Sequence, residues 1–431
     1  MSTLSIPCPW AAQARQKPQE PAIFSPDGSA LTWFELDTRI RQAQGSLPGP
    51  ADRPLLHIPG RTADDVALLV ASLRAGRDLL LLAPRLPEAE VDAMARRLQA
   101  VRFVPGAAGK PVATGTLGGG TLILTSGSTG DPRWIRHGVA AHVVSATAVS
   151  QALDLRAGDR WLWSLPMHHV GGLSILFRCA HVGAALVLPS TDFPDGITHL
   201  SLVPTQLGEA LDAGIPAPAS LRDVFLGGAA LSGTLLERAV KAGWPVRTSY
   251  GMTETASMVT LSERWTLPVP DHPHAGRALS HADVDIEKGR ILVRTDALAD
   301  GVADMEGWFA TADAGILDEK GHLTVQGRLD RVIISGGENL DPVRIERAIR
   351  ALPGVGMVTV VGVPDPKWGE RPVAFVAMKD GSPPSSDALR SALQTSLESY
   401  AIPDRFLPLP PPAPGQLKVR HADLVAAARE E

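Results

Sequence analysis

Short runs of consecutive apolar residues alternate with longer amphipathic segments through the middle of the chain. Strands that are apolar at successive positions are typical of parallel sheets whose two faces are both covered. Between them, the spacing of leucine and alanine predicts helices, for example over 204–213 and 232–242. We therefore expect parallel sheets covered by helices, which is an α/β fold. The strands are predicted at residues 121–124, 161–165, 185–188, 200–203 and 224–226.

The pattern changes after residue 280, where two pairs of short strands flank tight turns. Lys288-Gly289 separates the strands of one pair and Glu319-Lys320-Gly321 separates those of the other. Both pairs are therefore predicted to be β-hairpins. They predict a small antiparallel, barrel-like unit that completes an N-terminal domain over residues 1–329.

A further unit is predicted over residues 330–431. Asp341-Pro342 has the N-cap residue and the first-turn proline that are typical of a helix start. Apolar runs at 357–363 and 372–378 predict two strands, and a second helix is expected near 386–396. About a hundred residues are enough for a separate small α+β domain.

The composition narrows the range of partners. The chain has 431 residues, of which 44% are hydrophobic, and its formal net charge is −5. Such a charge attracts neither nucleic acid nor anionic lipid, so a small-molecule partner is expected. No window approaches the roughly 18 apolar residues of a spanning helix, and the first residues lack the pattern of a signal peptide. We expect a cytoplasmic protein without stable membrane insertion, and the sequence leaves open whether it forms a homo-oligomer.

A loop rich in hydroxyl groups and glycine carries the first candidate site. It follows a predicted strand and reads Thr-Ser-Gly-Ser-Thr-Gly-Asp-Pro-Arg over residues 125–133. Backbone N–H and side-chain O–H groups in such a loop can surround a polyphosphate, although the spacing differs from that of the common P-loop. On composition alone, a polar surface loop is an equally good interpretation.

Two later segments could complete a nucleotide site. In Ser249–Thr255, the aromatic ring of Tyr250 could cover a flat base, and the carboxylate of Glu254 suits Mg²⁺ bound mainly by phosphate oxygens. Asp313, at the end of the segment 308–313, could accept hydrogen bonds from both hydroxyls of a ribose. Taken singly, the first segment is more often an ordinary turn and the second a solvated hairpin.

Together and in this order, these segments resemble the adenylate-forming superfamily of acyl-CoA synthetases, adenylation domains and luciferases. The resemblance runs from about Leu122 to the C-terminus. It includes the segment Gly-Arg-Leu-Asp-Arg-Val-Ile-Ile-Ser-Gly-Gly-Glu-Asn at residues 327–339. Each motif is moderately specific, and their shared order excludes the interpretation of each as an ordinary loop or turn.

The resemblance implies roles for individual residues. Glu254 would hold Mg²⁺, and Thr253 would contact the α-phosphate. Asp330 would be the hinge of a mobile C-terminal domain, and Gly336 with Gly337 would lie beside the pantetheine arm of CoA. The implied ATP-binding residues are Thr125, Ser126, Gly127, Ser128, Thr129, Gly130, Arg133, Gly227, Gly228, Ala229, Tyr250, Gly251, Met252, Thr253, Asp313 and Arg328.

The implied reaction has two halves and uses ATP, Mg²⁺ and CoA. The acid carboxylate first attacks the α-phosphorus of ATP, and pyrophosphate leaves. A thiol then attacks the acyl-adenylate. A lysine directly after glycine usually serves the first half, but this chain has Gln416 there and Lys418 two residues later. Lys418 is therefore the expected catalytic lysine.

Three further segments resemble the o-succinylbenzoate–CoA ligases of menaquinone biosynthesis. They are residues 165–172, 177–178 and 201–206. That acid is an aromatic dicarboxylate, so its site needs a flat apolar slot and a cation for the carboxylate that does not react. Arg178 is the expected cation, Ser201 and Ser257 would add hydrogen bonds, and His169 would lie near the reacting carboxylate. For His168, a purely structural role is an equally good interpretation.

Two rival functions remain open at this stage. One is a carrier-loading adenylation enzyme or a ligase for another aryl or fatty acid. The other is a nucleotide-binding homologue without catalytic activity. The second is motivated by Gln416 and by Arg133, which replaces the usual lysine of the phosphate loop and has a different donor geometry.

Overall fold

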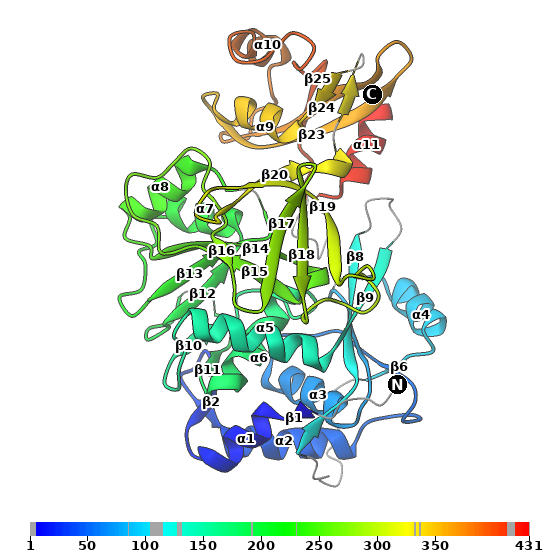
Figure 1. Cartoon of the computed structure of the whole chain (residues 1–431), viewed down its shortest axis with the longest axis vertical. Coiled ribbons are helices and arrows are strands. Elements are labelled where there is room, and N and C mark those ends of the chain that lie inside the picture. The colour runs from blue at the N-terminus through cyan, green and yellow to red at the C-terminus, as the bar shows by residue number, and fades with distance from the viewer. Residues whose placement is uncertain are drawn as a thin grey trace.

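Two helix-covered sheets and a curled antiparallel sheet form the larger part of the molecule, and a smaller unit stands at one end (Figure 1). The computed structural model describes residues 6–84, 86–103, 115–126, 132–190, 193–229, 231–331, 333–335, 338–411 and 419–430.

The largest sheet has a parallel centre and antiparallel edges. Parallel pairing runs from β2 to β14, while β3, β15 and β16 pair antiparallel. In spatial order its strands are β16 (Arg277–Ala278), β15 (Ser257–Leu261), β14 (Val246–Met252), β13 (Asp223–Leu226), β12 (His199–Leu202), β10 (Arg160–Leu162), β11 (Ala185–Val187), β2 (Pro21–Phe24) and β3 (Ala30–Thr32).

The second sheet is built in the same way and carries the predicted phosphate loop. Its central strands are parallel, and β8 pairs antiparallel with β9 at the edge. In spatial order its strands are β6 (Val101–Arg102), β4 (Leu55–His57), β5 (Leu79–Leu81), β8 (Gly120–Ser126) and β9 (Pro132–Gly138). A separate pair is formed by β1 (Ile6–Pro7) and β7 (Thr116–Leu117).

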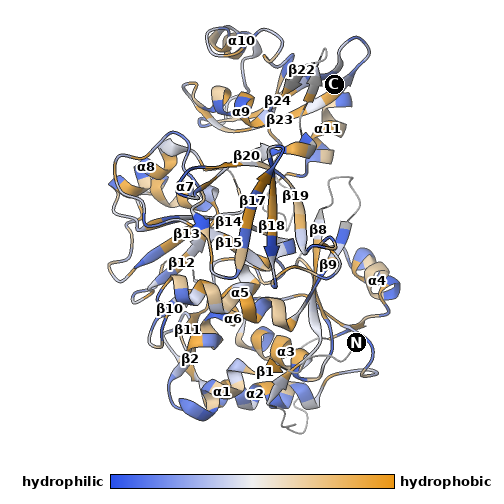
Figure 2. Cartoon of the chain, viewed as in Figure 1, coloured by the Kyte–Doolittle hydropathy of each residue, from blue (hydrophilic) through white to orange (hydrophobic). Residues whose placement is uncertain are grey.

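Helices cover these two sheets in layers. The central layer lies between them and buries one continuous hydrophobic core. It contains α1 (Pro9–Gln16), α2 (Trp33–Gly45), α3 (Ala63–Arg74), α5 (Val139–Ala152) and α6 (Val170–Val182). The outer face of the large sheet is covered by α7 (Pro204–Asp212) and α8 (Gly233–Lys241), and that of the second sheet by α4 (Glu88–Arg97). Figure 2 shows α3 and α6 as largely hydrophobic, which fits helices buried between two sheets.

The curled sheet is fully antiparallel. Its order is β17 (Ala282–Glu287), β18 (Arg290–Thr295), β19 (Trp308–Leu317) and β20 (Leu323–Arg328). Partly buried and exposed residues alternate along β17, which is the pattern of a strand with one solvent-exposed face. Tyr250 and Val259 from the large sheet pack against the inner face of the curled sheet, so the two sheets share a small core.

The C-terminal unit begins after a short 3₁₀ turn, η2 (Leu329–Arg331). Its sheet contains β22 (Glu338–Leu340), β21 (Ile333–Ser335), β24 (Gly369–Met378), β23 (Val355–Asp365) and β25 (Arg405–Pro408). On one face lie α9 (Pro342–Arg350) and α10 (Ser386–Leu393), and on the other α11 (His421–Glu430). The side chain of Asp341 accepts a hydrogen bond from Val343 N at 2.9 Å, so the predicted N-cap of α9 is confirmed.

The predicted fold class and nearly all the predicted elements are confirmed, with two differences. The strand expected over 161–165 ends at Leu162, because Ser164 N turns back to donate to Leu162 O at 2.9 Å. The strand expected over 121–124 extends to Ser126, so the first residues of the predicted phosphate loop belong to β8, which pairs with β9 as far as Ser126 opposite Pro132.

Candidate active site

The predicted motifs follow the carboxyl ends of parallel strands. The segment 227–229 follows β13, the segment 163–169 follows β10, and the η1 turn (Thr253–Thr255) follows β14. The carboxyl edge of a parallel sheet is the usual place for a ligand site in α/β folds. The topology therefore places the segments 163–169, 227–229 and 253–255 at one edge of the large sheet.

One hydrogen bond and one ion pair join three of the predicted ATP-binding residues. Tyr250 on β14 donates from its hydroxyl to Asp313 Oδ2 at 2.7 Å. Arg328 on β20 lies directly opposite Asp313 on β19, and its Nη1 is 3.6 Å from Asp313 Oδ1. Burial, followed by the negative charge of Asp313, raises the pKa of Tyr250. The phenol therefore stays protonated and holds the carboxylate in place.

Three glycines near Tyr250 lie where a side chain would clash with a neighbour or where the backbone conformation favours glycine. A Cβ on Gly251 would lie 2.0 Å from the carbonyl oxygen of Ser257, and one on Gly227 would lie 2.8 Å from Ser249 Oγ. Gly228 adopts a φ of 72°, in the left-handed region. These observations explain why glycine stands at these positions.

The turn that carries Thr253 and Glu254 leads into a strained backbone. Ala256 and Ser257 have φ values of 48° and 108°, which are unusual for residues with a Cβ. The buried hydroxyl of Thr255 donates to Ser257 O at 2.7 Å and accepts from Met252 N at 3.1 Å, so it fixes this conformation. Backbone strain that is held in this way is typical of functional sites. Glu254 lies half-buried on the turn.

Arg178 is fully buried and occupies the centre of the predicted acid site. It lies on α6 with 1% of its surface exposed, and its Nη2 donates to Ser257 Oγ at 3.0 Å. Its Nε has no hydrogen-bond partner, and no described carboxylate forms an ion pair with it. Burial lowers the pKa of Arg178 to about 9. A buried cation without a counterion is costly unless a ligand supplies the anion.

Trp161 connects Arg178 to Ser201. The guanidinium carbon of Arg178 lies 5.4 Å from the Trp161 ring centroid, within reach of a cation–π interaction. The indole Nε1 of Trp161 donates to Ser201 Oγ at 3.2 Å, and Ser174 Oγ donates to Ser257 Oγ at 3.3 Å. The structure therefore joins Ser201, Arg178 and Ser257 through contacts that include an aromatic face.

The two predicted histidines precede the helix that carries Arg178. His169 is the N-cap residue of α6, and its ring centroid is 4.4 Å from that of His168. Burial, with His169 and Arg61 as smaller contributions, lowers the pKa of His168 to about 3, and burial also lowers the pKa of His169. Both rings are therefore neutral near pH 7 and present apolar faces.

Several predicted residues cannot be placed by the structure. The side chains of Ser126 and Asp330 lie outside the described part of the chain, although their backbones belong to β8 and η2. Also outside the described residues are Gly127, Ser128, Thr129, Gly130, Gly336, Gly337 and Lys418. Arg133 is described on β9, where its carbonyl accepts a hydrogen bond from Thr125 Oγ1 at 3.3 Å.

Sequence reasoning missed Trp161, Ser174 and Arg61. Arg61 has a φ of 60° and donates from Nη1 to Ser164 O at 3.0 Å, at the start of the segment that leads to the two histidines. In sequence it lies between two buried residues whose side chains contact each other, with His57 Nε2 2.5 Å from Asp65 Oδ1. None of these residues belongs to a recognisable motif, so no signal in the sequence pointed to them.

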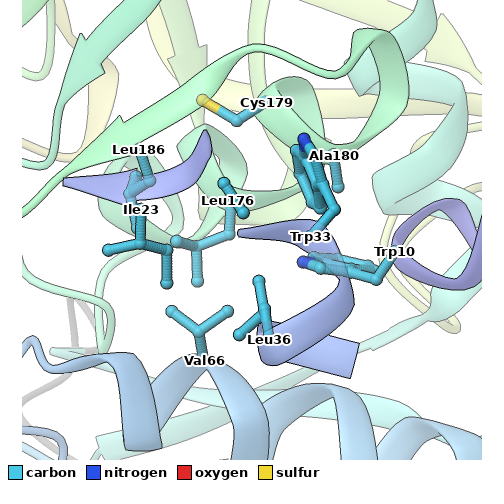
Figure 3. Close-up of a pocket in the computed structure, with 10 residues that line it drawn as sticks. Trp10, Ile23, Trp33, Leu36, Val66, Leu176, Cys179, Ala180 and Leu186 are labelled. Atoms are coloured by element: carbon cyan, nitrogen blue, oxygen red, sulfur yellow. The ribbon is translucent and has the colours of Figure 1, made fainter. Parts of the chain in front are cut away.

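A small apolar cavity lies elsewhere, between the central helical layer and strands β2 and β11 of the large sheet. Its volume is about 10 Å³, and Figure 3 shows apolar side chains surrounding it. A dry void of this size holds no substrate and is a packing gap. Its lining residues are Trp10, Ala22, Ile23, Trp33, Leu36, Val66, Leu176, Cys179, Ala180 and Leu186.

This arrangement defines the class of protein. Along the chain, the parallel strands come first, then the segment that carries Tyr250, and then the curled sheet that supplies Asp313. This is the order of these parts in an adenylate-forming enzyme. The family model of the AMP-binding enzymes matches residues 120–301, and that of the AMP-binding enzyme C-terminal domain matches residues 344–411. No helix in the described ranges is long and apolar enough to cross a membrane.

Comparison with individual proteins narrows the class. A 2-succinylbenzoate–CoA ligase of Haemophilus influenzae is 31% identical over 419 residues, which is 90% of this chain and 91% of the relative. A structure of an E. coli MenE variant with bound OSB-AMS is 28% identical, with 99% of both chains covered and a TM-score of 0.83. MenE from Bacillus subtilis in complex with ATP and magnesium is 25% identical, with 96% of this chain and 99% of that one covered and a TM-score of 0.84. The chain belongs to the 2-succinylbenzoate–CoA ligase family of AMP-forming acid–CoA ligases.

Proposed function

We propose that the chain joins o-succinylbenzoate to CoA through an acyl-adenylate, with release of AMP and pyrophosphate. Arg178 is the observation that carries this proposal. It is a buried cation, bonded to Ser257 and without a carboxylate partner among the described residues. A dicarboxylic acid would supply that partner, because only one of its two carboxylates reacts. The names of the relatives support the same acid.

The two ends of the proposed acid site lie at different levels of α6. His169 and Arg178 are nine residues apart in sequence, which corresponds to about 13 Å along a helix axis. The reacting carboxylate would then lie near the neutral imidazole of His169 and the other carboxylate near Arg178.

The residues present fit ATP with Mg²⁺. Among the described residues, no group of three or more His, Cys, Asp or Glu side chains could hold a metal ion. Mg²⁺ commonly takes one or two protein carboxylates together with phosphate oxygens, so Glu254 alone suffices as the protein ligand. When bound, the ion would neutralise charge on the phosphates and polarise them. Asp313, held by Tyr250, would accept the ribose hydroxyls.

In the first half-reaction, an oxygen of the acid carboxylate would form a bond to the α-phosphorus, and the bond from that phosphorus to the bridging oxygen of pyrophosphate would break. The enzyme's contribution is to hold the two reactants in line and to stabilise negative charge. In this proposal Thr253 contacts the α-phosphate, the segment 125–133 binds the leaving phosphates, and Lys418 neutralises the developing charge.

The second half-reaction would use the mobility of the C-terminal unit. We place the domain boundary between residues 329 and 330, with Asp330 as the hinge. Two hydrophobic clusters lie wholly within residues 333–428, which supports a unit with its own core. After rotation, the pantetheine arm of CoA would lie beside Gly336 and Gly337. The CoA thiolate would then attack the acyl carbon, form the thioester and expel AMP.

The proposal is tested by pyrophosphate release with a panel of acids. The panel contains o-succinylbenzoate, benzoate, a fatty acid and a dicarboxylate without a ring, each assayed with and without CoA. We expect release and thioester formation with o-succinylbenzoate, and much weaker release with benzoate. Preference for a monocarboxylic acid would reject the assignment of the acid. ATP binding without pyrophosphate release from any acid would reject the enzymatic function.

Substitutions of Glu254 and Asp313 are expected to change different properties of the enzyme, the Mg²⁺ requirement and the affinity for ATP. Glu254→Gln should raise the Mg²⁺ concentration needed for half-maximal adenylation, because a neutral amide is a poor ligand for a hard cation. Asp313→Ala should instead weaken ATP binding by about tenfold or more, through loss of charge-assisted hydrogen bonds to ribose. Both are measured by pyrophosphate release over a grid of ATP and Mg²⁺ concentrations. Glu287→Gln, on the exposed end of β17, is the control and should change neither constant. Identical behaviour of the two site variants would contradict the separate roles.

A further inference from the structure

The proposed polyphosphate site is divided between two sheets. The segment 127–131 connects β8 and β9 in the second sheet, whereas Glu254 follows β14 in the large sheet. Oxygens from a carboxylate and from phosphates must lie within about 2.1 Å of one Mg²⁺ ion. The distance between the two sheets must therefore be fixed closely for the site to work.

One short segment bonds to both parts. Ala299 N donates to Glu254 O at 2.8 Å, and the next residue, Asp300, donates from N to Arg136 O on β9 at 2.9 Å. The carboxylate of Asp300 also accepts a hydrogen bond from Arg136 Nη1. Two consecutive residues of the connection after β18 thus attach the Glu254 turn to the strand that leaves the phosphate segment.

The opposite side of Arg136 is held within its own sheet. Its Nε and Nη2 donate to the two carboxylate oxygens of Asp78 at 2.7 and 2.8 Å, a bidentate pair. Asp78 precedes β5, which belongs to the same sheet as β9. Hydrogen bonding to Asp78, with a further contribution from Asp300, raises the pKa of Arg136. Arg136 therefore bonds to its own sheet through Asp78 and to the segment after β18 through Asp300.

We propose that Arg136 and Asp300 form a positioning pair that sets the distance between strand β9 and the Mg²⁺-binding turn. Neither residue touches substrate in this role. The pair acts through the backbone contacts from Ala299 to Glu254 and from Asp300 to β9. This inference rests on the proposed adenylation and adds a determinant of how MgATP is bound.

Partial exposure of these side chains argues against a mainly stabilising role. The exposed fractions are 37% for Arg136, 26% for Asp78 and 54% for Asp300. Ion pairs with such exposure contribute little to folding stability. A pair that only stabilises the fold should therefore affect unfolding slightly and MgATP kinetics not at all.

The experiment compares Asp300→Asn with Asp78→Asn in the full-length chain. Each substitution removes one carboxylate partner of Arg136, but only Asp300 belongs to the segment that reaches Glu254. Asp300→Asn should raise the KM for MgATP and the Mg²⁺ requirement roughly tenfold, the scale of interaction energies between coupled groups. The KM for the acid and the Tm should stay close to their original values. Asp78→Asn should leave the MgATP constants within about twofold.

Two further measurements complete the test. Asp300→Glu keeps the charge and should restore most of the MgATP affinity. The Kd for MgATP, measured by calorimetry without any acid, should weaken in Asp300→Asn in parallel with the KM. This measurement is independent of the acid, so it still tests the pair if the proposed acid is wrong. Equal changes in both asparagine variants, or an unchanged Kd in Asp300→Asn, would overturn the proposal.

Discussion

Arg178→Met is expected to lower kcat/KM for o-succinylbenzoate by about 10²–10³-fold while the KM for ATP stays nearly unchanged. Removing one member of a buried ion pair costs several kcal/mol, because the other charge is left unpaired in a desolvated site. Here the other charge would be the carboxylate of the substrate. Methionine keeps much of the apolar length of arginine, so the packing along α6 is retained. Pyrophosphate release at varied acid and ATP concentrations measures both constants.

The same substitution should not destabilise the free protein. Arg178 is buried, its Nε lacks a hydrogen-bond partner, and burial lowers its pKa to about 9. The guanidinium of Arg178 therefore binds its proton less tightly in the folded state than in the unfolded state, where its pKa is that of an ordinary arginine. At pH 7 the charge opposes folding, and stability should rise as pH increases above about 9. In Arg178→Met that rise should be missing, and the Tm at pH 7 should equal or exceed the original value.

Two control variants separate charge from geometry. Arg178→Lys keeps a cation but loses the planar fork, so it should recover only part of the activity. Ser257→Ala removes the hydroxyl that holds Nη2 and should produce a smaller loss in use of the acid. A lower Tm for Arg178→Met together with an unchanged kcat/KM would show that Arg178 is a structural residue. That outcome would also remove the main support for the proposed acid.

The fold was predictable because its strands and hairpins have strong local patterns. β13 is Asp223–Leu226 and is buried along its whole length, which is the pattern expected of an inner parallel strand. The turn residues at Lys288-Gly289 marked the β17–β18 hairpin. The antiparallel edges were not predictable, because pairing between β8 and β9 or between β14 and β15 depends on the tertiary arrangement.

Site residues could be predicted from the sequence only where a charged residue lay within an apolar run or where a residue belonged to a known motif. Arg178 stood out as a charge within an apolar run, and the structure shows it buried beside Ser257. Asp300 gave no such signal, because its partner Arg136 is 164 residues away in sequence. Contacts of that kind come from the packing of two sheets, so no local pattern could identify them.

Lys418→Ala should separate the two half-reactions. In the proposed mechanism, Lys418 on the mobile C-terminal domain would reach the substrates only in the arrangement that makes the adenylate, and it would leave when the domain rotates. The variant should therefore form adenylate about 10² times more slowly or worse, which is the typical loss for one preorganised electrostatic group. Given preformed acyl-adenylate and CoA, it should make thioester at close to the original rate. Single-turnover assays of each half-reaction measure the two rates separately.

Two other variants make the Lys418 result specific. Lys379→Ala removes another lysine of the same domain and should leave both half-reactions unchanged. Arg420 is a second cation near Lys418, but its Nε and Nη2 are paired with Asp423 at 2.9 Å each, so Arg420→Ala should have the smaller effect. Equal damage to both half-reactions in Lys418→Ala would indicate general misfolding or a different domain geometry. If Lys418→Ala is fully active and Arg420→Ala is not, the catalytic charge lies at Arg420, four residues after Gln416, and the domain motion would then act through a guanidinium.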